Sequence, residues 1–136
     1  MRMYLDSSVV LRVALGEPGS LPAWNQITDP YSSELIRIEC LRTIDRARLQ
    51  GRLAEPDLAR VRADLLQIID SFTLIELDER IKARAADPFP TLVGTLDALH
   101  LASALAMRAT FDDLVVATHD RQLAMAAEAL GFGVVQ

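Results

Sequence analysis

The sequence predicts an α/β domain with a central, mostly parallel sheet that carries helices on both faces. Short apolar segments of strand character alternate along the whole chain with longer amphipathic segments of helical period. No internal repeat, low-complexity run or linker interrupts this alternation. Strands separated by helices are typical of parallel sheets, because each helix returns the chain to the starting edge. The 136 residues are expected to form one domain, residues 1–136, since they are too few for two sizeable cores.

The first half of the chain predicts two strands and three helices. Residues 3–5 predict a buried strand, and residues 8–15 a helix that ends at Gly16. A weak helical segment at 21–26 leads to a predicted turn at Asp29 and Pro30, and then to a strand over 31–33. Apolar residues recur at helical spacing over 34–49 and over 57–70, which predicts two amphipathic helices.

The second half predicts three more strands and three more helices. Residues 72–77 have the clearest β-propensity of the chain, and a short helix is expected over 78–86. Thr95 is predicted to cap a helix that runs through Met107, and Asp120 to cap one that stops at Gly131. The remaining strands are expected at 114–117 and 134–135.

Composition limits the kinds of partner that the chain can have. Its formal net charge is −5, so wholesale counterion release on nucleic acid is not expected. Seven arginines nevertheless fall within residues 37–62. They form either a solvated helical face with ion pairs such as Glu39–Arg42, or an edge that contacts phosphates. The single cysteine, Cys40, is expected to be a buried core thiol. A cytoplasmic protein is expected, because no signal-peptide pattern or membrane-length apolar run occurs.

Two aspartates follow predicted strands that an α/β sheet can place side by side. Asp6 ends the first strand, and Asp120 follows the strand over 114–117 by three residues. Ligands bind to such sheets beyond the carboxyl ends of the strands, where the strand order reverses. Asp6 and Asp120 therefore meet only if the first strand is central and the late strand is its neighbour.

Two further acids occupy unusual helical positions. Asp97 opens a helix that is apolar almost all round, and Glu39 lies at the margin of a buried helical stripe. A carboxylate that is partly removed from water needs a partner. Clustered carboxylates repel one another unless a cation shares them, so the four acids predict a divalent-metal site suited to phosphoryl transfer.

Each acid also has a simpler structural explanation. Asp6 suits a turn, Asp97 gains from the positive end of its helix, Asp120 is a plausible N-cap, and Glu39 can pair with Arg42. The two histidines, His100 and His119, fit a core edge and a loop better than they fit a set of metal ligands.

Four short segments around these acids are recognisable in their order along the chain. They are Tyr4-Leu5-Asp6-Ser7-Ser8, Ser33-Glu34-Leu35-Ile36-Arg37-Ile38-Glu39, Leu96-Asp97-Ala98-Leu99-His100-Leu101-Ala102 and Thr118-His119-Asp120-Arg121-Gln122-Leu123. Together they resemble a PIN-domain ribonuclease, and the compact length resembles the VapC toxins of bacterial toxin–antitoxin pairs. The resemblance covers essentially the whole chain.

The resemblance implies a fold, an activity, a cofactor and partners. The fold is a PIN-like three-layer α/β/α sandwich whose central, mostly parallel five-stranded sheet has the order 3-2-1-4-5. The activity is that of an endoribonuclease dependent on Mg²⁺ or Mn²⁺, which acts on RNA, is blocked by a cognate antitoxin and forms a homodimer. The implied catalytic and metal-binding acids are Asp6, Glu39, Asp97 and Asp120, with Ser7 and Thr118 as supporting hydroxyls. His100 matches a common family residue to which no catalytic role is assigned.

Hydrolysis by a metal-activated water predicts RNA products with 5′-phosphate and 3′-hydroxyl ends. The main alternative is a catalytically silent PIN fold that serves as a binding module for an antitoxin or RNA. Loss of an acid would favour that alternative, and all four acids are present. A haloacid-dehalogenase-like site would need an aspartate where Ser8 stands, and a receiver domain would need a lysine after a late strand, whereas Lys82 lies in a predicted helix.

Overall fold

Five short strands form one sheet, and every neighbouring pair is parallel. The computed structural model describes all residues from Met1 to Gln136. The strand order is β3-β2-β1-β4-β5, which confirms the predicted sheet and its central first strand. The strands are β1 (Arg2–Leu5), β2 (Asp29–Ser33), β3 (Thr73–Ile75), β4 (Val115–Ala117) and β5 (Gly133–Val135).

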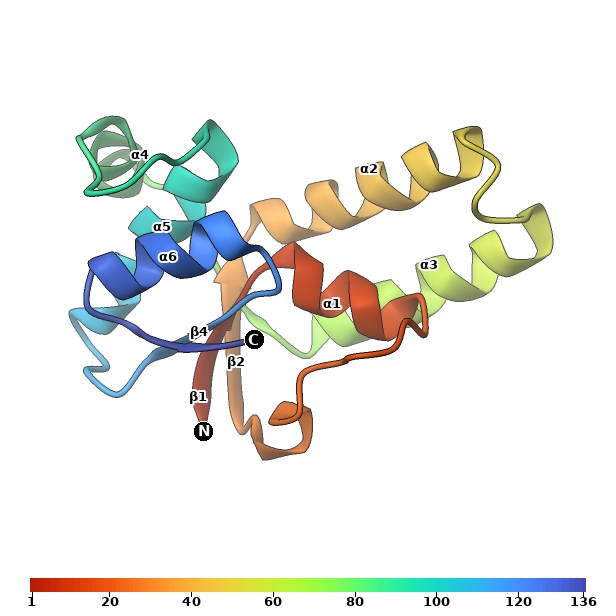
Figure 1. Ribbon diagram of the computed structural model, residues 1–136, viewed down its shortest axis with the longest axis horizontal. Coiled ribbons are helices and arrows are strands. Elements are labelled where there is room, and N and C mark those ends of the chain that lie inside the picture. The colour runs from red at the N-terminus through yellow and green to blue at the C-terminus, as the bar shows by residue number, and fades with distance from the viewer.

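Helices cover both faces of this sheet (Figure 1). They are α1 (Ser7–Ala14), α2 (Leu35–Leu49), α3 (Glu55–Asp70), α4 (Glu79–Ala86), α5 (Thr95–Arg108) and α6 (Arg121–Ala129), with a short 3₁₀ helix at Trp24–Gln26. Side chains alternate across a strand, so Tyr4 of β1 packs against α5 and α6, whereas Met3 and Leu5 pack against α1. None of the helices has the length and apolar character needed to cross a membrane.

A third part of the core lies between α1, α2 and α3. In Figure 1, α2 and α3 lie side by side as a hairpin that extends away from the sheet. Ile36, Cys40 and Ile44 of α2 pack there against Val61 and Leu65 of α3. Burial raises the pKa of the Cys40 thiol to about 12, with smaller contributions from the charges of nearby acids. The prediction of a buried core thiol is therefore confirmed.

The predicted turn at Asp29 and Pro30 is wrong, because both residues belong to β2. Asp29 pairs with Arg2, and Pro30 with Met3 of β1. The next strand, β3, begins only opposite Tyr31. Pro30 therefore lies where β2 is still at the edge of the sheet, which is the position in which a strand accepts a proline.

Two other elements differ from their predicted form. Only residues Thr73–Ile75 of the predicted strand over 72–77 pair with a neighbour, because β3 is an edge strand with β2 on one side only. Thr95 does not cap α5: Gly94 is the N-cap residue, and Thr95 is the first helical residue. No side chain caps this helix, and Asp97 is the acidic residue of its first turn.

The sheet order determines where a site can form. The chain leaves β1 and builds β2 and β3 on one side, and later builds β4 and β5 on the other. The carboxyl ends of β1 and β4 therefore flank the point at which the strand order reverses. Asp6 follows β1 directly, and Thr118 follows β4 directly.

Candidate active site

Asp6 is held in place at the carboxyl end of β1. Its carboxylate is only 4% exposed and accepts hydrogen bonds from the backbone N–H of Ser8 and from the Thr118 hydroxyl, the latter at 2.5 Å. The bond from Ser8 makes Asp6 the N-cap of α1. The Thr118 oxygen in turn accepts the backbone N–H of Asp120 at 2.9 Å. These contacts join the loops that follow β1 and β4 into one hydrogen-bonded unit.

Ser8, and not the predicted supporting residue Ser7, contacts the loop that follows β4 through its side chain. The Ser8 hydroxyl accepts the backbone N–H of His119 at 2.9 Å and lies 3.5 Å from the Thr118 hydroxyl. The Ser7 hydroxyl makes no hydrogen bond to the protein, whereas Thr118 is fully buried and bonded to Asp6. The pattern of a helix starting at residue 7 or 8 does not decide which serine faces the neighbouring loop.

Asp120 is exposed and has a clear structural role. It is the N-cap of α6, and its Oδ1 accepts the backbone N–H groups of Gln122 at 2.8 Å and Leu123 at 3.1 Å. The predicted cap is confirmed. Its second carboxylate oxygen accepts no hydrogen bond from the protein and so can bind a ligand.

Asp97 is the acid on which the other three act electrostatically. Burial raises the pKa of its carboxyl above the ordinary value, and the charges of Asp120, Asp6 and Glu39 raise it further, with His100 acting in the opposite direction. The half-buried Asp97 carboxylate accepts no hydrogen bond from the protein, unlike Asp6 and Asp120. Asp97 is therefore a desolvated carboxylate among like charges with no partner in the protein.

Glu39 of α2 meets His100 of α5, and not Arg42, the partner that the simpler explanation offered. Its side chain is 15% exposed, and Oε1 accepts a hydrogen bond from His100 Nε2 at 2.5 Å. Arg42 pairs with Asp45. Burial alone would lower the pKa of His100, but the bond to Glu39 and the nearby acidic charges outweigh burial and raise it. The position of Glu39 at the margin of the buried stripe, expected from sequence, is confirmed, and the alternative ion pair with Arg42 does not form.

The four acids thus gather within electrostatic reach of one another without closing on a common point. As the side chains stand, no three Asp, Glu, His or Cys groups converge closely enough to enclose a metal ion. Three of the acids already have protein partners, since Asp6 binds Ser8 and Thr118, Glu39 binds His100, and Asp120 caps α6. Like charges also keep carboxylates apart when no cation is present.

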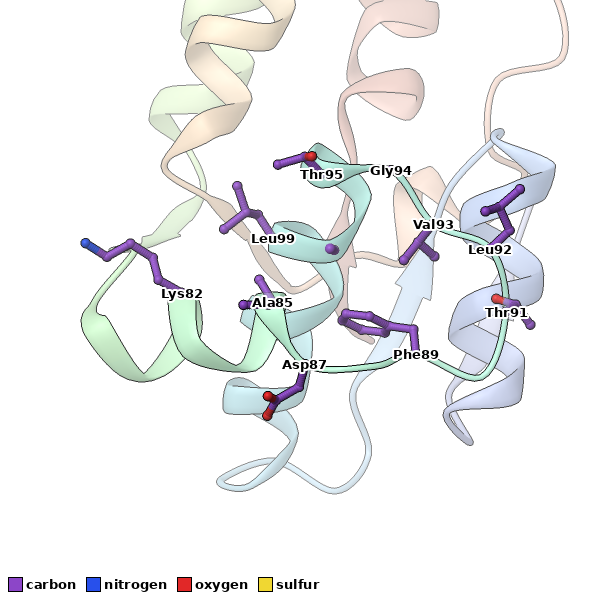
Figure 2. A pocket seen from close by; sticks show the side chains of 12 residues that line it. Lys82, Ala85, Asp87, Phe89, Thr91, Leu92, Val93, Gly94, Thr95 and Leu99 are labelled. Atoms are coloured by element: carbon purple, nitrogen blue, oxygen red, sulfur yellow. The ribbon is translucent and has the colours of Figure 1, made fainter.

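A pocket of about 600 Å³ lies beside the start of α5 (Figure 2). Its walls come from α4, from the loop over 87–94 and from the first turns of α5, and most of its lining is apolar. Figure 2 shows Phe89 and Val93 of the loop and Leu99 of α5 around this pocket, while the Lys82 ammonium points away from Phe89. None of the four acids lines this pocket.

The arginines of α2, of α3 and of the loop between them divide into two groups. Arg42, Arg48 and Arg60 form ion pairs with neighbouring carboxylates, as a solvated helical face would. The arginines without an ion pair are Arg37, Arg46, Arg52 and Arg62, all of them exposed. The paired arginines fit the solvated-face interpretation, and the unpaired ones remain available to phosphates.

Comparison with known proteins gives a consistent result across the chain. The model of the PIN domain family matches residues 3–129. The chain is 34% identical to Ribonuclease VapC46 of Mycobacterium tuberculosis over 140 residues, which cover 98% of this chain and 95% of that protein. Its fold resembles that of FitAcB from Neisseria gonorrhoeae, with a TM-score of 0.71, 20% identity, and coverage of 98% of this chain and 96% of that one. It also resembles VapBC2 from Rickettsia felis, bound to a DNA fragment from its promoter, with a TM-score of 0.69, 11% identity and full coverage of both chains.

Proposed function

The chain belongs to the PIN-domain family as a VapC-type ribonuclease, and from this premise we propose that its four clustered acids carry the catalysis. They are Asp6, Glu39, Asp97 and Asp120. The observation that supports this most strongly is the environment of Asp97. Its carboxylate is half-buried and unpartnered, and the charges of the other three acids raise its pKa. A folded protein keeps such an arrangement at a functional site more readily than at a structural one.

The donor set fits a hard divalent cation such as Mg²⁺ or Mn²⁺, which prefers carboxylate oxygens. Asp97 accepts no hydrogen bond, so its side chain is free to turn towards a cation held beside Asp6. One oxygen of Asp120 and one of Glu39 also have no hydrogen-bond partner in the protein. When bound, a divalent cation lowers the pKa of water and stabilises negative charge on a phosphate.

The remaining roles follow from how firmly each acid is held. The Ser8 N–H and the Thr118 hydroxyl fix Asp6, so we assign Asp6 to direct metal contact. We assign Asp97 to direct metal contact as well, because its carboxylate accepts no hydrogen bond. Glu39 and Asp120 contact the cation through water, or they orient the water that attacks the phosphate. That water attacks the phosphorus in line and forms a new P–O bond. The bond between phosphorus and the ribose 3′-oxygen breaks, and the 3′-oxygen leaves with a proton as a hydroxyl. The RNA products therefore carry 5′-phosphate and 3′-hydroxyl ends, since the 2′-hydroxyl takes no part.

The partners follow from the same premise. We propose that a cognate antitoxin covers the site in the cytoplasm, because a structure of similar fold is a toxin–antitoxin complex from Klebsiella pneumoniae. Three apolar side chains near Asp97 and Asp120 suit such a cover: Leu92, Leu96 and Met125 are 80%, 49% and 59% exposed. We also expect the free chain to form a homodimer. Sedimentation at the mass of a single 15.0 kDa chain across all concentrations would rule out the homodimer.

The nuclease proposal is tested by cleavage of a mixed RNA pool with the purified chain. The reaction is run with Mg²⁺, Mn²⁺ or EDTA, and the product ends are sequenced. We expect metal-dependent cuts with 5′-phosphate ends, lost in Asp6→Ala and Asp97→Ala. The exposed Asp112→Ala serves as a matched control and is expected to cut normally. Products with 2′,3′-cyclic phosphates would contradict the proposed water attack.

A further inference from the structure

A buried histidine connects the sheet to one of the proposed catalytic acids. His100 of α5 is 2% exposed, and both of its ring nitrogens have partners from other elements. Nδ1 lies 2.7 Å from the hydroxyl of Tyr4 in β1, and Nε2 lies 2.5 Å from Glu39 Oε1 in α2. The Tyr4 and His100 rings pack edge to face, with their centroids 5.8 Å apart and their planes at 77°. Three elements thus meet through one chain of side-chain contacts.

The direction of the hydrogen bond to Glu39 does not depend on the protonation of His100. A carboxylate only accepts hydrogen bonds, so Nε2 must carry a hydrogen and donate it to Glu39. In the neutral imidazole Nδ1 accepts the Tyr4 O–H, and in the charged form it donates to the Tyr4 oxygen. Either form keeps Glu39 tied to the buried side of the site.

Core packing alone does not account for this histidine. An imidazole inside a protein must satisfy both nitrogens, or its burial costs free energy that an apolar side chain would not cost. Here the satisfying partners are a fully buried tyrosine and a carboxylate at the edge of the acidic cluster. The Glu39 carboxylate makes no other side-chain hydrogen bond, so His100 alone fixes its orientation.

We propose that His100 is a positioning residue for the nuclease: with Tyr4 behind it, it holds one oxygen of Glu39 and leaves the other for a divalent cation or its water. This inference rests on the proposed function. Carboxylates at metal sites are commonly oriented by such outer contacts, and their loss typically weakens metal binding by about 10–100-fold. Tyr4 acts one step further out, because it contacts His100 and not Glu39.

The experiment measures Mn²⁺ binding by calorimetry in the RNA-free protein, together with kcat and KM for RNA cleavage. His100→Leu removes both contacts, His100→Gln keeps an N–H for Glu39, and Tyr4→Phe removes only the outer contact. We expect His100→Leu to weaken Mn²⁺ binding by about 10–100-fold, with kcat reduced more than KM is raised. His100→Gln should recover most of that loss, and Tyr4→Phe should weaken binding only a few-fold. His100→Gln and Tyr4→Phe keep the test valid if His100→Leu does not fold.

The effect must also depend on Glu39. In a Glu39→Gln background, His100→Leu should cause little further loss of Mn²⁺ affinity, because the group that it orients is already altered. Equal losses in both backgrounds, or wild-type Mn²⁺ affinity in His100→Leu, would overturn the positioning role and leave the metal site standing. A wild-type chain that binds no Mn²⁺, or binds it equally well after Asp6→Ala and Asp97→Ala, would overturn the proposed metal site and this inference with it.

Discussion

At the scale of single residues, the main feature is a carboxylate that the fold keeps against its electrostatic preference. Asp97 is half-buried, near three other acids, and its pKa is raised. The folded protein therefore binds a proton at Asp97 more readily than the unfolded chain does. Such a group lowers the free energy of unfolding at neutral pH. This destabilisation disappears only when the carboxyl is protonated in both the folded and the unfolded protein.

We predict that Asp97→Asn makes the metal-free protein more stable to unfolding at neutral pH. The gain in free energy of unfolding follows from the raised pKa of Asp97. It is fully present above the pKa that Asp97 has in the folded protein, and it shrinks as the pH falls towards the ordinary value of 3.8. Urea unfolding in EDTA at several pH values measures it, with Asp112→Asn in an exposed loop as the control. If Asp97→Asn were less stable than the wild type at neutral pH, the favourable charge at the start of α5 would be the dominant role of Asp97.

At the scale of elements, the start of α6 combines a structural and a proposed catalytic role in one residue. Asp120 caps the helix through two backbone N–H groups, and its charge contributes to the field at Asp97. Asparagine is as good an N-cap as aspartate, whereas alanine cannot cap. A pair of substitutions therefore separates the two roles.

We predict that Asp120→Ala is less stable than Asp120→Asn by about 1 kcal/mol, within a range of 0.5–2 kcal/mol. Both variants lose the charge, so thermal or urea unfolding of the pair isolates the cap. RNA cleavage should fall in both, because the carboxylate is absent from both. Full cleavage by Asp120→Asn would show that Asp120 is a cap and nothing more.

At the scale of the whole molecule, the acids themselves predicted that β1 is central and lies beside β4, whereas the full strand order was implied by the family resemblance. Asp6 and Asp120 can approach one another only if β1 and β4 are neighbours, and the sheet pairs Tyr4 with Val116 and Leu5 with Ala117. The N-cap at Asp120 and the buried side of Glu39 were equally accessible from local patterns. Local patterns were sufficient at these positions, although at the start of α5 they placed the N-cap one residue late, at Thr95 instead of Gly94.

Contacts between distant segments were not predictable in this way. His100 meets Glu39 and Tyr4 across separations of 61 and 96 residues, and no local pattern selects it from the other side chains of α5. The same holds for Ser8, since only the packing of the loop after β4 brings its hydroxyl to the backbone N–H of His119. Pro30 suggested a turn because a strand accepts a proline only where it lacks a neighbour. Whether β2 lacks one at Pro30 depends on where β3 begins, which the local sequence does not show.

A crystal structure of the Mn²⁺-soaked protein would show whether the four acids close around a divalent cation. We predict an anomalous scattering peak with carboxylate oxygens of Asp6 and Asp97 as ligands. Glu39 should keep its bond to His100, and the Asp97→Asn protein should lose the peak. A fully soaked crystal with no Mn²⁺ beside Asp6, or with Mn²⁺ bound equally well in Asp97→Asn, would contradict the account.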